Sequence, residues 1–374
     1  MDHAGRLGRL RSGLEENDLD CLLVTHLPNV RYLCGFTGSA AALLILAGGA
    51  FLFTDGRYRT QAKAEVKNGN LNDKDVSIVV ARKSPLVAAA EWLAARRKSS
   101  ARKSLSLFLL GVEAEWISAG MRDRLALLLK GKARVRPAPP LVERARMVKD
   151  AAEILRIRRA VELGASLFQV ACGKIRPGVS EVEVAAAMEY EARCGGAEGM
   201  SFATILASGK RSAIVHGRAS AARIPRRGFV VCDFGVILAD YCSDRTRTVH
   251  VGRPSREARQ FYEAVLEAQQ AAIAAVRPGV TAGEVDRAAR RVLGKRKLAR
   301  YFTHSTGHGL GLEIHEAPRL AAGQTQKLEP GMVITIEPGA YVPGKWGVRI
   351  EDVVVVRASG CEVLTGTDKE LVVI

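Results

Sequence analysis

Four acidic residues in two short stretches of the chain have the spacing that a metal site would need. Asp233 and Asp244 lie within residues 230–251, VVCDFGVILADYCSDRTRTVHV, where two runs rich in β-branched residues flank Ala239 and Asp240. This pattern predicts a β-hairpin. The aspartates are equally far from a turn centre between Leu238 and Ala239, so we expect them to face each other with Cβ atoms roughly 5 Å apart. Two carboxylates this close repel each other unless a proton or a cation lies between them.

A second stretch repeats this arrangement with two glutamates. Residues 333–356, VITIEPGAYVPGKWGVRIEDVVVV, again contain two apolar runs on either side of a Pro-Gly turn. Glu337 and Glu351 each lie seven residues from Gly344, so they too should face each other across a hairpin. If the hairpins converge, four carboxylates and a nearby His would suit two hard or borderline divalent ions. The alternative is that the aspartates only flank a turn on a solvated edge, since Asp is tolerated at strand ends.

A stretch rich in His and Gly precedes the second hairpin. HSTGHGLGLEIH places His304, His308 and His315 within twelve residues, among glycines that allow close backbone approach. A phosphate-binding loop fits poorly because the G-x-G-x-x-G spacing fails, and a helical zinc site fits poorly because no Glu follows the first His. We therefore expect one further metal ligand and two histidines beside it.

The elements that would position these residues occur twice. RPGVSEVEV at 176–184 returns as RPGVTAGEV at 277–285, 101 residues later. Each copy predicts a helix that ends at Pro-Gly and a second helix that begins with a capping box, at Ser180 or at Thr281. A His and then an acidic hairpin follow each copy at nearly the same spacing. We infer a duplicated helix-helix-hairpin unit whose pseudo-twofold arrangement brings both acid pairs to one site.

The rest of the chain fits an ordinary globular protein with 374 residues, 48% hydrophobic and 25% charged, which is enough for two or three domains. Residues 1–135 read as an α/β unit, with a β-hairpin expected within 42–54 and no catalytic cluster. Residues 136–150 begin with Arg-Pro-Ala-Pro-Pro, which cannot continue a helix or a central strand. We interpret them as a linker to a domain at 151–374.

The net charge of +17 raises the question of a nucleic-acid partner. A nucleic-acid-binding protein would gather its positive charge in a patch with interleaved aromatic residues. Here Arg is spread along the chain and aromatic residues make up 5%, so we do not expect one. No apolar run is long enough to span a bilayer, no signal-peptide pattern occurs, and the seven Cys form no CxxC pair. We expect a cytoplasmic protein that does not contact membranes.

Five residues in this order, Asp233, Asp244, His308, Glu337 and Glu351, resemble the metal ligands of the M24 "pita-bread" metallopeptidases. The segments SDRTRT, HSTGHGLGLEIHEAP, TIEPGAY and RIEDVVVV carry the resemblance, which is strongest to the Xaa-Pro peptidases, aminopeptidase P and prolidase. NVRYLCGFTGS and LFTDGRYRTQA resemble the creatinase-type N-terminal domain that accompanies them, so nearly the whole chain is covered. The implied fold is α/β (α+β), with a creatinase-like α/β domain before a pseudo-twofold pita-bread catalytic domain.

The resemblance also implies how these five residues would hold two divalent ions. Asp233 would chelate one ion, His308 and Glu337 would bind the other, and Asp244 and Glu351 would bridge the pair. Such a pair activates a water molecule and polarises the scissile carbonyl group. Manganese is the metal that the resemblance implies, while zinc and cobalt are chemically possible.

Further residues receive roles around the ions by the same resemblance. Glu337 would also carry a proton from the water to the leaving nitrogen. His216 and His315 would stand on the substrate side, one of them steadying the tetrahedral oxyanion. His304 would line the pocket for Pro, and Arg319 would bind the free carboxylate of a dipeptide substrate.

Tyr341 and Arg349 would support Glu337 and Glu351 without binding the ions themselves. Together these features predict an Xaa-Pro aminopeptidase that acts on peptides with Pro at the second position, and the alternative is an Xaa-Pro dipeptidase (prolidase). A homodimer is implied by the resemblance. Two other classes remain open: a non-catalytic binding protein on the same fold, and a metal-free amide hydrolase of the creatinase type.

Overall fold

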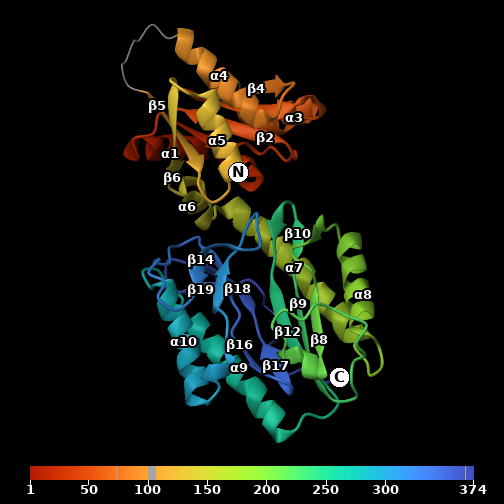
Figure 1. Ribbon diagram of the computed structural model, residues 1–374. Coiled ribbons are helices and arrows are strands. Elements are labelled where there is room, and N and C mark those ends of the chain that lie inside the picture. The colour runs from red at the N-terminus through yellow and green to blue at the C-terminus, as the bar shows by residue number, and fades with distance from the viewer. Residues whose placement is uncertain (73, 100–106, 367) are drawn as a thin grey trace. The chain divides into compact units, whose positions relative to one another are not determined.

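The computed structural model describes residues 1–72, 74–99, 107–366 and 368–374 (Figure 1). The chain forms two compact units, Met1–Arg146 and Met147–Ile374. Within the described ranges, no helix is both long enough and apolar enough to cross a membrane.

The first unit is built on a six-stranded mixed sheet with the strand order β4-β3-β2-β1-β5-β6. Its strands are β1 (Cys21–Val24), β2 (Ala41–Leu46), β3 (Gly49–Asp55), β4 (Val76–Ala81), β5 (Phe108–Glu113) and β6 (Ala133–Ala138). Its helices are α1 (His3–Glu16), α2 (Leu27–Cys34), η1 (Gly56–Tyr58), α3 (Arg59–Asn68), α4 (Pro85–Ser99), α5 (Ala119–Leu128) and α6 (Leu141–Met147). The hairpin expected within 42–54 is confirmed by the antiparallel pairing of β2 with β3.

The segment 136–150, interpreted above as a linker, contains regular structure. Its first residues complete β6, which is an edge strand of the sheet. Pro137 is tolerated there because the outer side of an edge strand forms no ladder hydrogen bonds. Helix α6 follows, and Asp150 then caps the next helix. The domain limits 1–135 and 151–374 remain a prediction.

The second unit contains the rest of the helices and strands described in the chain. Its helices are α7 (Ala151–Lys174), α8 (Glu181–Cys194), η2 (Gly209–Ala213), α9 (Arg256–Ala275), α10 (Ala282–Lys295) and η3 (Ala299–Tyr301). Its first strands are β7 (Gly199–Met200), β8 (Ile205–Ser208), β9 (Gly228–Phe234), β10 (Val236–Leu238), β11 (Tyr241–Cys242) and β12 (Arg245–Val251). The later strands are β13 (Gly307–Gly309), β14 (Glu316–Leu320), β15 (Val333–Ile336), β16 (Gly339–Val342), β17 (Trp346–Arg349), β18 (Asp352–Val356) and β19 (Cys361–Val363).

The predicted repeat is present in this unit as two similar halves (Figure 1). In the first half, α7 and α8 precede a sheet with the order β12-β9-β8, and in the second half α9 and α10 precede strands in the order β18-β15-β13. Helices α8 and α10 both begin with the predicted capping box, at Ser180 and Thr281. The sequence repeat therefore corresponds to a repeat of structure.

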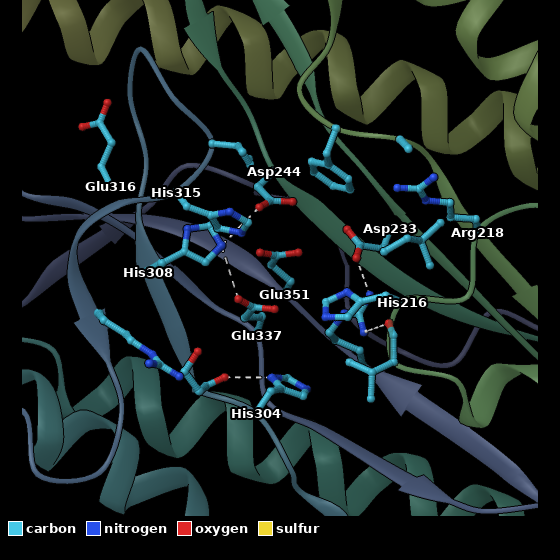
Figure 2. Close-up of a pocket in the computed structure, with 18 residues that line it drawn as sticks. His216, Arg218, Asp233, Asp244, His304, His308, His315, Glu316, Glu337 and Glu351 are labelled. Atoms are coloured by element: carbon cyan, nitrogen blue, oxygen red, sulfur yellow. Dashed lines mark hydrogen bonds and ion pairs between the residues drawn. The ribbon is translucent and has the colours of Figure 1, made fainter. Parts of the chain in front are cut away.

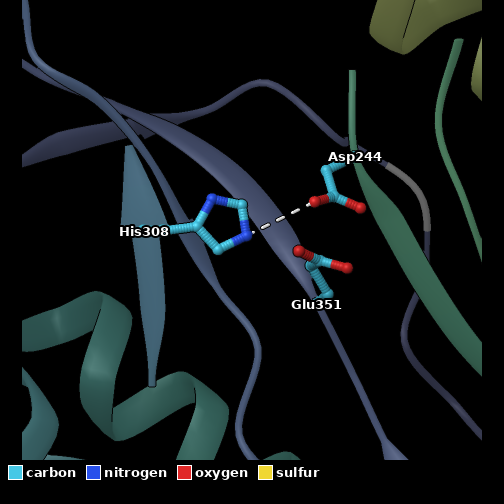
Figure 3. A group of neighbouring side chains, drawn as sticks. All are labelled: Asp244, His308 and Glu351. Atoms are coloured by element: carbon cyan, nitrogen blue, oxygen red, sulfur yellow. Dashed lines mark ion pairs between the residues drawn. The ribbon is translucent and has the colours of Figure 1, made fainter. Parts of the chain in front are cut away.

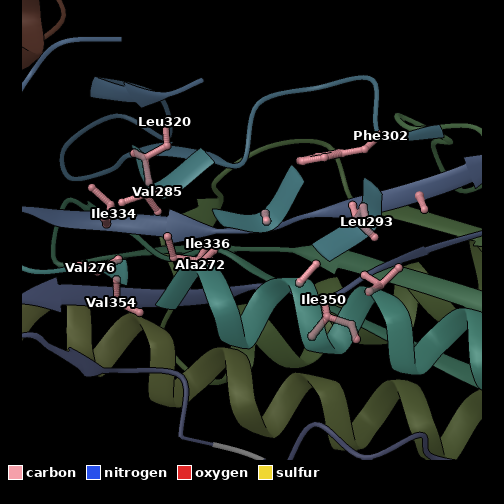
Figure 4. Packing of buried hydrophobic residues seen from close by; sticks show 14 of the residues in the cluster. Ala272, Val276, Val285, Leu293, Phe302, Leu320, Ile334, Ile336, Ile350 and Val354 are labelled. Atoms are coloured by element: carbon pink, nitrogen blue, oxygen red, sulfur yellow. The ribbon is translucent and has the colours of Figure 1, made fainter. Parts of the chain in front are cut away.

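Alternation along the strands decides which side chains reach the site. In β15, Ile334 and Ile336 pack with α9 and α10 in one apolar core (Figure 4), whereas Val333 packs in a second core with residues of α7. Side chains in a strand alternate between the two faces, so Glu337 lies on the same face as Val333. The β18 strand follows the same rule, since Val353 belongs to the second core and Glu351 is two residues before it.

Candidate metal centre and its cavity

The first acidic hairpin has a register different from the one expected. Its turn residues are Ala239 and Asp240, as expected, with φ of 49° and 72°, but the centre of the turn lies one residue later than the midpoint between the two aspartates. Asp233 consequently pairs with Thr246 and not with Asp244. The expectation that the two aspartates lie directly opposite each other is wrong. The two aspartates nevertheless point to the same face of the sheet. A shift of one residue in the turn centre moves the residue paired with Asp233 by two positions, and residues two apart in a strand point to the same face.

The second acidic hairpin has the predicted register. Strands β16 and β17 pair symmetrically about Gly344, and β15 and β18 continue the same register. Gly344 has a φ of 72°, a conformation that suits glycine. Glu337 and Glu351, which lie between these two ladders, therefore face each other as expected.

Both hairpins contribute to one cavity of about 630 Å³ (Figure 2). Every residue that the sequence assigned to the site lines this cavity except Tyr341. The lining residues are Phe202, Ala203, Ile205, Val215, His216, Arg218, Asp233, Asp244, His304, Ser305, His308, Ile314, His315, Glu316, Arg319, Glu337, Arg349 and Glu351.

The histidine nearest to the carboxylates is His308. Its Nε2 atom lies 3.6 Å from Asp244 Oδ2 and 3.4 Å from Glu337 Oε1. Potential ligand atoms of His308, Asp244 and Glu351 all lie within 4.8 Å of one another (Figure 3). The Nδ1 atom is 2.9 Å from the carbonyl oxygen of Gly309, which can only accept, so Nδ1 donates and Nε2 keeps its lone pair for a metal ion.

Glycines on both sides of His308 permit this placement. A Cβ atom on Gly307 would collide with the backbone carbonyl of Thr335, and one on Gly309 would collide with that of Ala317. The backbone of β13 therefore fits between its neighbours only without side chains at these two positions. This is the physical reason for the glycines in the HSTGHGLGLEIH stretch.

The buried acids carry an electrostatic cost that the protein compensates only in part. Burial and the charge of Glu351 raise the pKa of Asp244 well above its usual range, and burial and the charge of Glu337 raise the pKa of Glu351 well above its own. Burial also raises the pKa of Glu337 to about 7. Asp244 Oδ1 and Glu351 Oε1 are buried and have no hydrogen-bond partner among the described residues. Such orphaned buried oxygens are costly unless something binds them.

A divalent cation would relieve this cost, and the donor set fits one. Carboxylate oxygens with a single imidazole are ligands that Mn²⁺ and related divalent ions accept. Burial lowers the pKa of His308, which favours the neutral imidazole that metal binding requires. The residues present therefore fit divalent metal ions.

Arg349 contacts Asp233 directly and the glutamates only indirectly. Its guanidinium forms an ion pair with Asp233 and donates hydrogen bonds to Tyr341 Oη at 2.6 Å and to Thr246 Oγ1 at 3.1 Å. The hydroxyl of Thr246 in turn donates to Glu351 Oε2 at 2.8 Å. The expected support of Glu351 by Arg349 is therefore indirect, through a threonine that lies in the SDRTRT motif.

The other histidines surround the acids on the open side. The ring of His315 lies 4.4 Å from that of His308, centroid to centroid, and the exposed His216 lines the cavity near Asp233 (Figure 2). His304 Nε2 is 3.0 Å from Tyr341 Oη, and burial together with the charge of Arg349 lowers the pKa of His304 to about 3. The catalytic and substrate-binding roles of these residues remain predictions.

Two features of the cavity were missed by reading the sequence. Glu316, beside His315, forms a buried ion pair with Lys149, with Nζ and Oε2 3.0 Å apart, and no motif signals this contact. Arg218 also lines the cavity. A signal for it existed, because Arg218 and Arg319 differ by 101 positions, the same offset as between the two Arg-Pro-Gly-Val segments.

Comparison with known proteins agrees with this geometry. Residues 156–358 match metallopeptidase family M24, and residues 6–148 match the creatinase/prolidase N-terminal domain. The chain is 35% identical over 362 residues to the Xaa-Pro dipeptidase of Pyrococcus horikoshii, which covers 96% of each chain. The structure of an Xaa-Pro dipeptidase from Bacillus anthracis superimposes with a TM-score of 0.91, at 38% identity and with full coverage of both chains. The X-Pro aminopeptidase from Thermotoga maritima has a TM-score of 0.86, at 34% identity, covering 98% of this chain and 99% of its own.

Proposed function

We propose that this chain, which belongs to metallopeptidase family M24 and carries a creatinase/prolidase N-terminal domain, is an Xaa-Pro dipeptidase. Family membership and the dipeptidase relatives make it a metal-dependent Xaa-Pro peptidase. The choice of substrate length is the step that we propose. The sequence favoured the aminopeptidase, with the dipeptidase as the alternative. The names of the relatives from Pyrococcus horikoshii and Bacillus anthracis support the alternative better.

The observation that carries the proposal is the position of Arg319. Strand β14 pairs with β13 so that Arg319 lies directly opposite His308, and residues at paired positions point to the same face. Arg319 is exposed and lines the cavity, and its guanidinium has no hydrogen bond or ion pair to any residue that the structure describes. A free guanidinium is suited to bind a carboxylate through two parallel hydrogen bonds. In an Xaa-Pro dipeptide the only terminal carboxylate is on Pro, directly next to the scissile bond.

Asp233, Asp244, His308, Glu337 and Glu351 would hold the metal ions. When bound, two divalent ions supply an activated water and polarise the scissile carbonyl group. We propose Mn²⁺ as the ion, because the resemblance implies it and the carboxylate-rich set of ligands suits it.

The leaving group explains why a proton carrier is needed. The Pro nitrogen has no hydrogen in the peptide bond, so it must gain a proton before it leaves as an amine. Glu337 would accept the proton released by the attacking water and pass it to this nitrogen. His315 and His216 would donate hydrogen bonds to the carbonyl oxygen as negative charge develops there. His304, held by Tyr341, would contact the Pro ring.

The experiment is a comparison of matched substrates. Purified protein reconstituted with Mn²⁺ would be assayed for kcat/KM on Leu-Pro and on Leu-Pro-Ala, with a sample in excess chelator as the control. We expect the dipeptide to be preferred by about tenfold or more, which corresponds to about 1.4 kcal/mol. A preference for the tripeptide would instead favour the aminopeptidase, as the Thermotoga maritima neighbour suggests. Hydrolysis of neither peptide would refute both proposals.

A further inference from the structure

A second arginine reaches the cavity from the other half of the repeat. Arg218 forms a β-bridge with Ile205, and Ile205 pairs on its other side with Asp233. In the second half, Arg319 pairs with His308 of β13 as Arg218 pairs with Ile205 of β8. Figure 2 shows Arg218 on the Asp233 side of the cavity, across from His308 and His315. The repeat thus supplies one arginine beside each end of the acidic cluster.

Among the described residues, the side chain of Arg218 has no counter-charge. It is exposed, and in the ranges that the structure describes its guanidinium has no hydrogen bond, ion pair or aromatic partner. The third arginine of the cavity differs, because Arg349 is buried and its guanidinium binds Asp233 and Tyr341. The remaining acid, Glu316, is paired with Lys149. Two arginines are therefore left to face the substrate.

A dipeptide with a neutral first residue can satisfy only one of these two arginines. Its single carboxylate is on Pro, and the proposed function assigns it to Arg319. The scissile bond must lie at the acidic cluster between the two halves, so the first residue extends toward the half that contains Arg218. A carboxylate on the first side chain would meet the second guanidinium, whereas a lysine side chain would be repelled.

We infer that Arg218 is a specificity-determining residue that makes this peptidase prefer dipeptides with an acidic first residue, Glu-Pro or Asp-Pro. This inference rests on the proposed function, because it assumes that Arg319 takes the carboxylate of Pro. It adds the chemical class of the first residue, which neither the family nor the names of the relatives specify.

Glu-Pro and Gln-Pro are the matched substrates for the test, because they have nearly the same shape and differ by one negative charge. The assay is kcat/KM for both dipeptides, on wild-type protein and on Arg218→Gln. We expect the wild type to prefer Glu-Pro by about tenfold and the variant to lose this preference while its kcat/KM for Gln-Pro stays within about twofold. Arg226→Gln is the control, since Arg226 is exposed, lies outside the cavity lining and removes the same unit of charge.

Each of the following results would overturn the inference. Equal kcat/KM for Glu-Pro and Gln-Pro in the wild type, or a preference that survives Arg218→Gln, would refute the role of Arg218 and leave the dipeptidase proposal intact. A loss of equal size on both dipeptides, with Gln-Pro-Ala unaffected, would show that Arg218 binds the terminal carboxylate. Failure of the wild type to hydrolyse any Xaa-Pro dipeptide would refute the proposed function and this inference together.

Discussion

Replacement of Arg319 by Ala should weaken the binding of dipeptides without affecting longer substrates. Hydrogen bonds between charged groups contribute roughly 1.5–3 kcal/mol, and the exposure of Arg319 places its contribution at the lower end, because solvent screens the pair. A loss of about 1.4 kcal/mol corresponds to a tenfold increase in KM. A tripeptide carries its carboxylate one residue farther from the scissile bond, so Arg319 contributes nothing to its binding.

The assay is the pair of KM values for Leu-Pro and Leu-Pro-Ala on wild-type protein and on Arg319→Ala. We expect KM to increase by about tenfold for Leu-Pro and to stay unchanged for Leu-Pro-Ala. Arg226→Ala controls for the loss of one exposed positive charge, and equal metal content in all three proteins controls for damage to the neighbouring His308. An equal loss on both substrates, or no loss on either, would refute the carboxylate role of Arg319.

The other predictions concern the acids and histidines. Asp244→Asn or Glu351→Gln should abolish turnover, because a neutral amide binds cations poorly; either variant with more than a few per cent of the wild-type kcat at saturating Mn²⁺ would contradict this. His216→Ala or His315→Ala should lower kcat by about 100-fold or more and leave the metal content intact, and loss of metal would instead make the replaced residue a ligand. Metal binding should release protons. The pKa values of Asp244 and Glu351 are raised in the metal-free protein, whereas a metal ion binds both carboxyl groups in their ionised form. Affinity for Mn²⁺ should therefore fall as the pH is lowered. Calorimetry in buffers of different ionisation enthalpy measures the protons released on binding, and a result of no release would contradict this prediction.

The two hairpins illustrate what the sequence could predict and what it could not. The second hairpin has a glycine, Gly344, at the centre of its turn, so the register of Glu337 and Glu351 followed from counting. The turn of the first hairpin consists of Ala239 and Asp240 at positive φ. Alanine is uncommon in that conformation, so the residue types did not fix the register. Taking the midpoint between the two aspartates as the turn centre gave a register that was wrong by two positions.

The repeat was visible because its signals are local. Pro-Gly and the capping boxes at Ser180 and Thr281 are defined by neighbouring residues, and both boxes are present. Contacts between distant segments gave no such signal, and neither the pairing of Lys149 with Glu316 nor that of Arg349 with Asp233 could be predicted. The preference for dipeptides or longer peptides could not be predicted for the same reason, since it depends on which groups converge at the ends of the cavity.

The central claim is that the buried acids and His308 form a site for two divalent metal ions. The most direct test is the number of Mn²⁺ ions bound per chain, measured by elemental analysis after chelator treatment, reconstitution and gel filtration. We expect about two Mn²⁺ ions per wild-type chain and clearly fewer per chain of Asp244→Asn. A wild-type protein that retains no Mn²⁺ after reconstitution, or that retains as much metal when Asp244 is replaced, would contradict it.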